Sequence, residues 1–144
     1  MRKLVVAILF VALLIGFNRV NGASGWEFIY SDDNGDVFFA TQSFEIDKDS
    51  KTYTVWMKTE FNEEFCERIT KTNNYEKPFS HTISQVKIDY KNKRILYLTS
   101  IAYDVDGGIL GSMEGMHSWE DIMPETSYEK VFNSTYNCYK EYYM

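Results

Sequence analysis

Side chains alternate between apolar and polar along residues 52–61 (TYTVWMKTEF), and this period-two pattern constrains the fold more than any other feature of the chain. One set comprises Tyr53, Val55, Met57, Thr59 and Phe61, and the intervening set comprises Thr54, Trp56, Lys58 and Glu60. Successive side chains of a strand point to opposite faces of a sheet. The pattern therefore predicts a strand with one face on a core and a mostly solvated opposite face.

Two further long runs continue the expected sheet. Residues 81–90 (HTISQVKIDY) resume the alternation, and residues 94–104 (RILYLTSIAYD) are apolar on both faces, which favours a central position. The polar segment KNK separates the two runs, and this arrangement predicts an antiparallel hairpin. The shorter run at residues 109–114 (ILGSME) predicts a strand nearer an edge.

Shorter signals complete the sheet and its connections. Residues 26–30 and 36–46 are rich in β-forming residues, and Asn34-Gly35 between them is typical of a type I′ hairpin turn. The alternation then breaks, and residues 62–69 (NEEFCERI) predict a short helix followed by a loop.

The last segment of the chain has the spacing of an amphipathic helix. Pro124 stands where a helix can begin, and Glu125 suits the positive end of the helix dipole. A stripe at helical spacing comprises Tyr128, Val131, Phe132, Thr135, Tyr139 and Tyr142. Strands followed by one helix predict an α+β fold, an antiparallel β-sheet of about six strands with a C-terminal α-helix packed on it.

The first residues have the composition of a signal peptide. A basic start (MRK) precedes an apolar run at residues 4–17, and Val20 and Gly22 suit the −3 and −1 positions of a cleavage site. The apolar run is shorter than the roughly 20 residues that span a bilayer, so no stable membrane span is expected. We predict a cleaved signal peptide at residues 1–22 and a single exported domain at residues 23–144.

The charge balance excludes one class of partner. The chain has 15 basic and 21 acidic residues and a net charge of −6, and removal of residues 1–22 takes away three basic residues and no acid, which leaves −9. A protein that binds phosphate backbones needs a basic footprint, so nucleic acid is not an expected partner. Lys91, Lys93 and Arg94 form a basic cluster in this acidic domain, and they are either a solubilising turn or a binding site.

The aromatic residues and the cysteines each leave alternatives open. The 3 Trp, 11 Tyr and 10 Phe are compatible with an aromatic core or with an aromatic binding surface. Cys66 and Cys138 are the two cysteines, and in an oxidising compartment an even number favours one disulfide, provided that their Cα atoms come within reach. The sequon NST at residues 133–135 matters only in a host that glycosylates proteins.

The segment YDVDGG at residues 103–108 is a candidate calcium loop that fails the test of ligand spacing. A loop that starts at Asp104 needs an oxygen ligand at its fifth position, glycine at its sixth and glutamate at its twelfth. This chain has Gly108, Ile109 and Gly115 there. The same segment fits a hairpin turn, which we therefore predict.

No catalytic or metal-binding motif accompanies these turns. His81, His117 and the two cysteines have neither C-x₂-C nor H-x₃-H spacing, so no metal site is expected. The sequence also contains no nucleophile elbow, phosphate loop or H-E-x-x-H motif. We expect neither an enzyme nor a cofactor.

Several short motifs occur in a fixed order along the chain. They are Val55, Trp56 and Lys58, then Tyr103, Asp104 and Gly107, then Ser112, then Trp119, Ile122 and Pro124, and finally Cys138. In order and spacing these motifs resemble the bacterial surface-adhesin protein E family over most of residues 26–138. The resemblance implies a small exported domain with an antiparallel sheet and a C-terminal helix.

The chain departs from the family pattern in three places. Thr126 stands where the family tends to have serine. The family's usual first cysteine corresponds here to Tyr90, so Cys138 would need Cys66 as a new disulfide partner. The lipidated cysteine of a surface-anchored adhesin has no counterpart near the expected cleavage site.

The resemblance also implies a function. We expect an exported, non-enzymatic binding domain of the bacterial envelope, placed in the periplasm, on the cell surface or outside the cell, and compatible with a homodimer. The adhesin that gives the family its name binds host extracellular-matrix proteins, and the expected contact site here is Lys91, Lys93 and Arg94, with Tyr90 and Tyr97 on the flanking strands. The alternative is a secreted or periplasmic carrier of a small apolar ligand, held in an aromatic pocket between sheet and helix.

Overall fold

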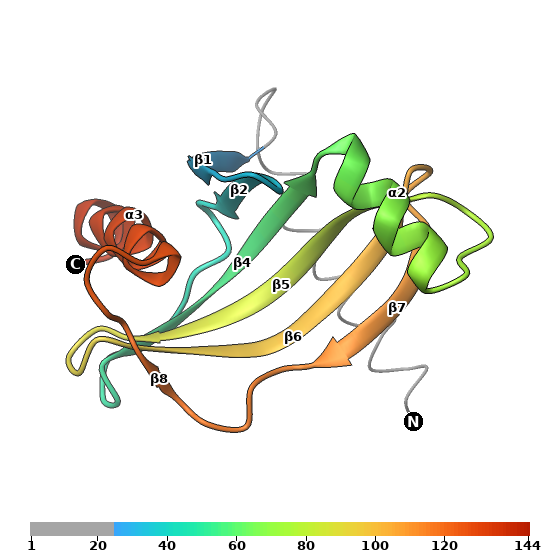
Figure 1. Ribbon diagram of the computed structural model, residues 1–144. Coiled ribbons are helices and arrows are strands. Elements are labelled where there is room, and N and C mark those ends of the chain that lie inside the picture. The colour runs from blue at the N-terminus through green and yellow to red at the C-terminus, as the bar shows by residue number, and fades with distance from the viewer. Residues whose placement is uncertain (1–24) are drawn as a thin grey trace.

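The computed structural model describes residues 25–144, which form one antiparallel sheet with two helices (Figure 1). The predicted signal peptide, residues 1–22, lies outside the described residues. The strands are β1 (Trp26–Ser31), β2 (Gly35–Ala40), β3 (Glu45–Asp47), β4 (Thr52–Phe61), β5 (Phe79–Asp89), β6 (Arg94–Asp104), β7 (Ile109–Glu114) and β8 (Glu120–Asp121). The helices are α2 (Glu63–Thr72) and α3 (Ser127–Tyr142).

The long strands β4, β5 and β6 form the body of the sheet. Its order is β1-β2-β4-β5-β6-β7, with β3 added to β4 and β8 added to β6. Tyr53 pairs with Ile88 and Val55 pairs with Val86, so the apolar sets of β4 and β5 share one face. The predicted α+β fold is confirmed. The β-rich run predicted at residues 36–46 is divided into β2 and the short strand β3, and β8 is a short addition to the expected six strands.

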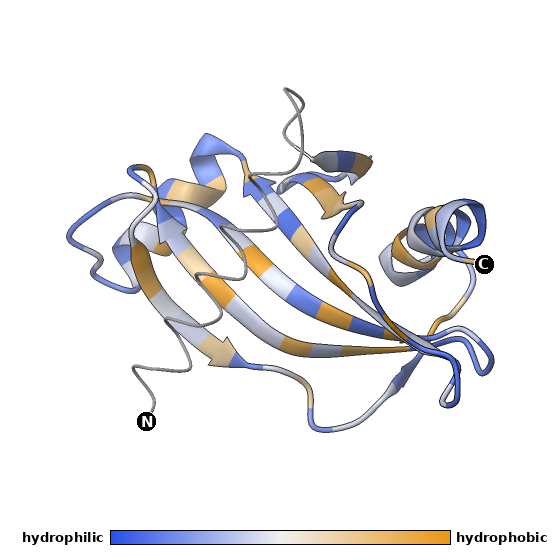
Figure 2. Ribbon diagram, turned by 180° about the vertical axis from the view of Figure 1, so that it is seen from behind, coloured by the Kyte–Doolittle hydropathy of each residue, from blue (hydrophilic) through white to orange (hydrophobic). Residues whose placement is uncertain are grey.

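Local sequence patterns account for the arrangement of the strands. Figure 2 shows apolar and polar positions alternating along the long strands, with hydrophilic turns at the end of the sheet near α3. β6, which is apolar on both faces, has β5 on one side and β7 and β8 on the other. The predicted hairpin between β5 and β6 is confirmed.

A tight turn joins β6 to β7. The Asp104 carboxylate accepts hydrogen bonds from the backbone N–H groups of Asp106 (2.8 Å) and Gly108 (2.9 Å), and the bond from Gly108 lowers the pKa of Asp104. Gly107 has a φ of 83°, a conformation that glycine adopts without strain. The interpretation of YDVDGG as a hairpin turn is confirmed.

α2 follows β4 directly and extends to Thr72, three residues past its predicted end. The Asn62 side chain caps it by accepting a hydrogen bond from the Phe65 N–H at 2.9 Å. The Phe65 ring stacks on Phe61 with their centroids 4.3 Å apart. Within residues 25–144, neither helix has the length and apolar character needed to cross a membrane.

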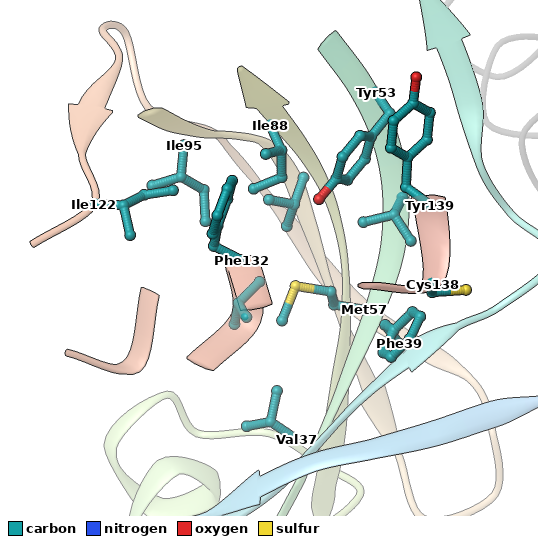
Figure 3. Close-up of a cluster of buried hydrophobic side chains, with 13 residues drawn as sticks. Val37, Phe39, Tyr53, Met57, Ile88, Ile95, Ile122, Phe132, Cys138 and Tyr139 are labelled. Atoms are coloured by element: carbon teal, nitrogen blue, oxygen red, sulfur yellow. The ribbon is translucent and has the colours of Figure 1, made fainter. Parts of the chain in front are cut away.

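The core lies between one face of the sheet and α3. Figure 3 shows Phe132 and Tyr139 of the helix against Ile88, Ile95 and Tyr53 of the strands. The fully buried strand residues are Phe39, Tyr53, Val55, Val86, Ile88 and Ile95. Much of the aromatic content therefore serves the core, and these side chains fill the space between the sheet and α3.

α3 begins at Ser127, after the cap residue Thr126. The Thr126 hydroxyl oxygen accepts a hydrogen bond from the Glu129 N–H at 3.3 Å, and the cap itself is extended. Pro124 lies before this cap, so the expected start is displaced by three residues.

The predicted stripe of α3 is confirmed except at its last residue. The buried residues of the helix are Val131, Phe132, Thr135, Cys138 and Tyr139. Tyr142 is 70% exposed. The following residue, Tyr143, returns to the core instead and stacks on Phe44 with a centroid distance of 5.0 Å.

A buried hydrogen bond joins α3 to β4. The Tyr53 phenol oxygen lies 2.7 Å from the Thr135 hydroxyl oxygen, and Thr135 donates to the Val131 carbonyl oxygen at 2.8 Å. Because Thr135 has one hydroxyl proton and uses it for Val131, Tyr53 is the donor in the first bond. Both Tyr53 and Thr135 are fully buried, so neither hydroxyl has water as a substitute partner.

We expect Thr135→Val to lower the free energy of unfolding by about 1–3 kcal/mol, because the buried Tyr53 hydroxyl loses its acceptor. Tyr53→Phe removes that hydroxyl, so adding Thr135→Val to it should cost less than Thr135→Val alone. Urea denaturation of the two single variants and the double variant measures the coupling. Strictly additive effects would contradict the assigned hydrogen bond.

Candidate functional site

Two turns meet at the end of the sheet near α3. Residues 47–51 connect β3 to β4, residues 89–93 connect β5 to β6, and Thr52 pairs with Asp89 where these strands adjoin the turns. The Tyr90 N–H donates to the Lys51 carbonyl oxygen at 3.1 Å. The register therefore places the turns side by side, as Figure 1 shows in teal and yellow.

The two turns are built in the same way. The Asp47 carboxylate accepts from the N–H groups of Asp49 (3.0 Å) and Ser50 (3.2 Å), and the bonds from Ser50 lower the pKa of Asp47. The Asp89 carboxylate accepts from the Asn92 N–H at 2.9 Å. Each turn thus begins with an aspartate that binds the backbone two or three residues later.

Each turn also ends with a lysine in the left-handed region. Lys51 has a φ of 58° and Lys93 a φ of 50°. A residue with a Cβ atom costs about 1 kcal/mol more than glycine in this conformation. The stability of the turns therefore does not explain lysine at either position.

A stack of tyrosines leads from the core to the surface beside these turns. Tyr53 in β4 stacks on Tyr139 in α3 at 5.3 Å and on Tyr90 at 6.1 Å. Tyr136, one helical turn before Lys140, stacks on Tyr90 with a centroid distance of 5.7 Å and an interplanar angle of 22°. Tyr53 is buried, whereas Tyr90 and Tyr136 are half-buried, so the outer part of the stack is accessible.

The turns and the tyrosines surround a depression of about 450 Å³, here called the tyrosine–lysine depression. Its lining residues are Lys48, Lys51, Tyr90, Lys91, Tyr136, Tyr139 and Met144. Lys140 lies next to it, with its Nζ atom 5.0 Å from the centroid of the Tyr136 ring. Three lysines line the depression, and no acidic residue of the described chain is among its lining residues.

The accessible phenol of Tyr90 is uncharged at neutral pH. Its hydroxyl oxygen lies 3.3 Å from that of Tyr139, and this hydrogen bond raises the pKa of Tyr90 from 10, which is already well above neutral pH, to about 12. Tyr90 contributes an aromatic ring and an uncharged hydroxyl group, while the surrounding lysines contribute positive charge. This combination suits an anionic ligand that also has a ring or hydroxyl groups.

The structure separates the three basic residues that the sequence grouped together. Lys91 is exposed and lines the depression. The Lys93 Nζ lies 5.9 Å from the Phe132 ring. Arg94 donates to the Asp89 carboxylate at 2.8 Å and lies over the Trp119 ring at 5.3 Å. Of the predicted cluster, only Lys91 is placed in the depression.

Sequence reasoning missed Lys48, Lys51, Tyr136 and Lys140. A signal for the first two was present, because DKDSK and DYKNK both run from an aspartate to a lysine four residues later, at adjoining ends of two adjacent strands. The register that brings the two segments together was not evident from either segment alone.

None of the residues of the family-like motifs is among the lining residues of the depression in the described part of the chain. Tyr103 is buried and stacks on His81 at 5.0 Å, and Trp119 packs under Arg94. The Trp56 N–H donates to the Ser43 hydroxyl oxygen at 2.9 Å, and Pro124 is exposed before α3.

The predicted disulfide between Cys66 and Cys138 is not supported. Both are free thiols, and they belong to α2 and α3, which Figure 1 shows at opposite ends of the sheet. The Cys66 sulfur lies 3.4 Å from the Ser80 carbonyl oxygen, whereas Cys138 is buried in the core. Burial raises the pKa of Cys66, and it raises that of Cys138 to about 11.

A second depression, of about 600 Å³, lies between α2 and the start of β5. Phe61, Pro78, Phe79 and Val105 give it an apolar lining, and Cys66 also borders it. In residues 25–144, no group of three or more His, Cys, Asp or Glu side chains is placed to hold a metal ion.

Comparison with known proteins supports the fold. No family model and no curated protein sequence matches this chain. An antiparallel sheet with a C-terminal helix of this kind is found in protein E of Haemophilus influenzae, which superposes with a TM-score of 0.54 at 10% sequence identity, covering 85% of this chain and 89% of that one. A structure of protein E from non-typeable Haemophilus influenzae gives 0.49 at 12% identity, covering 85% and 82%. The chain thus has a protein E-like fold.

We expect Arg94→Ser to lower the free energy of unfolding by about 1–3 kcal/mol, because it removes a charged hydrogen-bond partner of the buried Asp89. Lys91→Ser should stay within about 0.5 kcal/mol of the parent, since Lys91 is exposed and has no comparable pairing. Urea denaturation at pH 7 compares the two variants. Equal effects would contradict the separate roles assigned to the two cations.

The same pair predicts a pH dependence. Burial raises the pKa of Asp89, but hydrogen bonds from Asn92 and Arg94 together lower it by more, so it lies below the ordinary value of 3.8. Its contribution to stability is therefore complete above that value and is lost as the pH falls through the lower folded-state pKa. Arg94→Ser should show a smaller loss of stability between neutral and strongly acidic pH than the parent.

Proposed function

We propose that this chain is an exported, non-enzymatic binding domain of the bacterial envelope, which engages an anionic extracellular-matrix partner at the tyrosine–lysine depression. The observation that carries this proposal is a depression lined by three lysines on a domain with a net charge of −9. The protein E-like fold supports an adhesin-like role. Export rests on the expected signal peptide at residues 1–22.

Electrostatics favours this location over the rest of the surface. At physiological ionic strength the Debye length is about 8 Å, so a partner at the depression is affected mainly by nearby charges. The two turns, residues 47–51 and 89–94, contain five cations (Lys48, Lys51, Lys91, Lys93 and Arg94) and three aspartates (Asp47, Asp49 and Asp89). The aspartates keep their charge when they accept hydrogen bonds, so the formal charge of the two turns is +2. The local balance is therefore positive on an acidic domain.

The groups in the depression favour binding over catalysis. The lining residues supply ammonium groups, phenols and a thioether, which attract anions and pack against rings. General acid–base chemistry near neutral pH is usually performed by histidine or by carboxylates with shifted pKa values. Neither type is among the lining residues in the described part of the chain.

A carrier of a small apolar ligand remains the second candidate, and one observation favours it. The depression beside α2 has an apolar lining, although it is not the pocket between the sheet and the C-terminal helix that the carrier hypothesis required. An apolar ligand found by native mass spectrometry of the purified domain, and lost in Phe79→Ser, would favour this candidate.

We expect the triple variant Lys48→Ser, Lys51→Ser and Lys91→Ser to bind immobilised basement-membrane extract at least tenfold more weakly than the parent. The loss should appear mainly in the association rate and should diminish in high salt, because the lysines are exposed. Surface plasmon resonance measures both rates.

The matched control removes Arg68, Lys71 and Lys77 near α2 in the same way and gives the same net charge. It should bind within about twofold of the parent. Equal loss in both triple variants would remove the depression as the site, and the absence of binding by the parent would contradict the proposed function.

Lys51→Gly separates binding from stability. Glycine fits the left-handed conformation at residue 51, so the free energy of unfolding should rise by up to about 1 kcal/mol. Loss of the cation should weaken binding to the same extract several-fold. Thermal denaturation and surface plasmon resonance measure the two effects. Binding that is unchanged in this more stable variant would contradict a role for Lys51.

A further inference from the structure

We propose that the tyrosine–lysine depression takes a sulfated sugar segment, of the kind carried by sulfated polysaccharides. This inference rests on the proposed function, and it specifies which chemical group of the partner the depression holds. Three features carry it: the aromatic surface, the spread of the lysines and the available hydroxyl groups.

The aromatic surface suits a sugar ring better than a carboxylate alone. The Tyr90 and Tyr136 rings lie 5.7 Å apart with 22° between their planes, and both residues are half-buried in the wall of the depression. The C–H groups on one face of a pyranose ring pack against such aromatic rings. An acidic peptide side chain would use the cations and leave this surface uncovered.

The cations are spread over three segments of the chain. Lys48 and Lys51 come from the turn before β4, Lys91 comes from the turn after β5, and Lys140 comes from α3. This spread suits a ligand that carries several negative charges along its length. No arginine of the described chain is among the lining residues. Arg94 of the adjacent turn forms an ion pair with Asp89 instead.

The lysines supply charge without a fixed geometry. A guanidinium group binds carboxylates and tetrahedral oxyanions through two parallel hydrogen bonds, whereas an ammonium group acts as a compact point charge. Three lysines therefore accept sulfate groups in several orientations along a flexible chain, and the choice of a sugar as the ligand rests on the aromatic rings and the hydroxyl groups.

The phenols provide uncharged hydrogen-bonding groups next to these cations. The Tyr90 and Tyr139 hydroxyl oxygens are 3.3 Å apart, a long distance for an O–H···O bond. A sugar hydroxyl group beside Tyr90 would find both a donor and an acceptor there. Ring packing, sulfate contacts and hydroxyl contacts thus lie within one depression.

The experiment compares three probes on the full domain at 0.15 M salt by isothermal titration calorimetry. The probes are a sulfated heparin hexasaccharide, the same hexasaccharide after chemical desulfation, and a hexaglutamate peptide. We expect the sulfated sugar to bind at least tenfold more tightly than either of the others. The triple variant Lys48→Ser, Lys51→Ser and Lys91→Ser should lose at least tenfold of that affinity.

A tyrosine variant tests the ring contact separately from charge. Tyr136→Leu keeps an apolar side chain and the net charge, and we expect it to weaken binding of the sulfated sugar about threefold or more. Tyr142→Leu, on the exposed end of α3, is the matched control and should leave the affinity unchanged. Circular dichroism checks that both variants are folded. Equal affinities for the sulfated sugar in both variants would overturn the ring contact.

The outcomes distinguish this inference from the proposed function. Hexaglutamate binding as tight as that of the sulfated sugar would overturn the sugar inference while leaving an anion-binding depression. The same holds if none of the three probes binds but the parent still binds basement-membrane extract through the three lysines. If the parent binds neither the probes nor the extract, the proposed function fails as well.

Discussion

The hydrogen bond from the Tyr53 phenol to the Thr135 hydroxyl group fixes α3 against β4, and the arrangement at the end of the sheet depends on it. Tyr53 also stacks on Tyr139 of the helix and on Tyr90 at the end of β5. One buried side chain thus contacts both elements that form the depression. If α3 shifted along the sheet, Tyr136 would no longer meet Tyr90, and the aromatic surface between the lysines would be lost.

The two turns place lysines beside α3 and β4, and the left-handed conformation of Lys51 and Lys93 lowers the local stability of the turns. Aspartates stabilise the start of each turn through backbone N–H groups, while lysines occupy left-handed positions that favour glycine. Residues that break a local rule without a structural gain often serve a function. Here Lys51 lines the depression, whereas Lys93 contacts Phe132 of α3. The two left-handed lysines therefore lie in different surroundings, one in the wall of the depression and one beside the helix.

Features that depend on neighbouring residues could be predicted from the sequence, whereas features that depend on contacts between distant segments could not. The strand at residues 52–61 and the hairpin around residues 91–93 were predictable, because alternation and turn composition are local properties of the chain. The pairing of Arg94 with Asp89 was not predicted, since the burial of Asp89 could not be recognised from sequence. Lys48 was missed because its place beside the second turn depends on the register of two strands.

Lysine footprinting of the domain with and without basement-membrane extract tests the proposed binding site most directly. Brief acetylation followed by mass spectrometry reports the reactivity of each lysine separately. We expect the partner to protect Lys48, Lys51 and Lys91, and to leave Lys71 and Lys77 near α2 as reactive as in the free domain. Protection confined to the lysines near α2, with Lys48, Lys51 and Lys91 fully reactive in the complex, would contradict the proposed binding site.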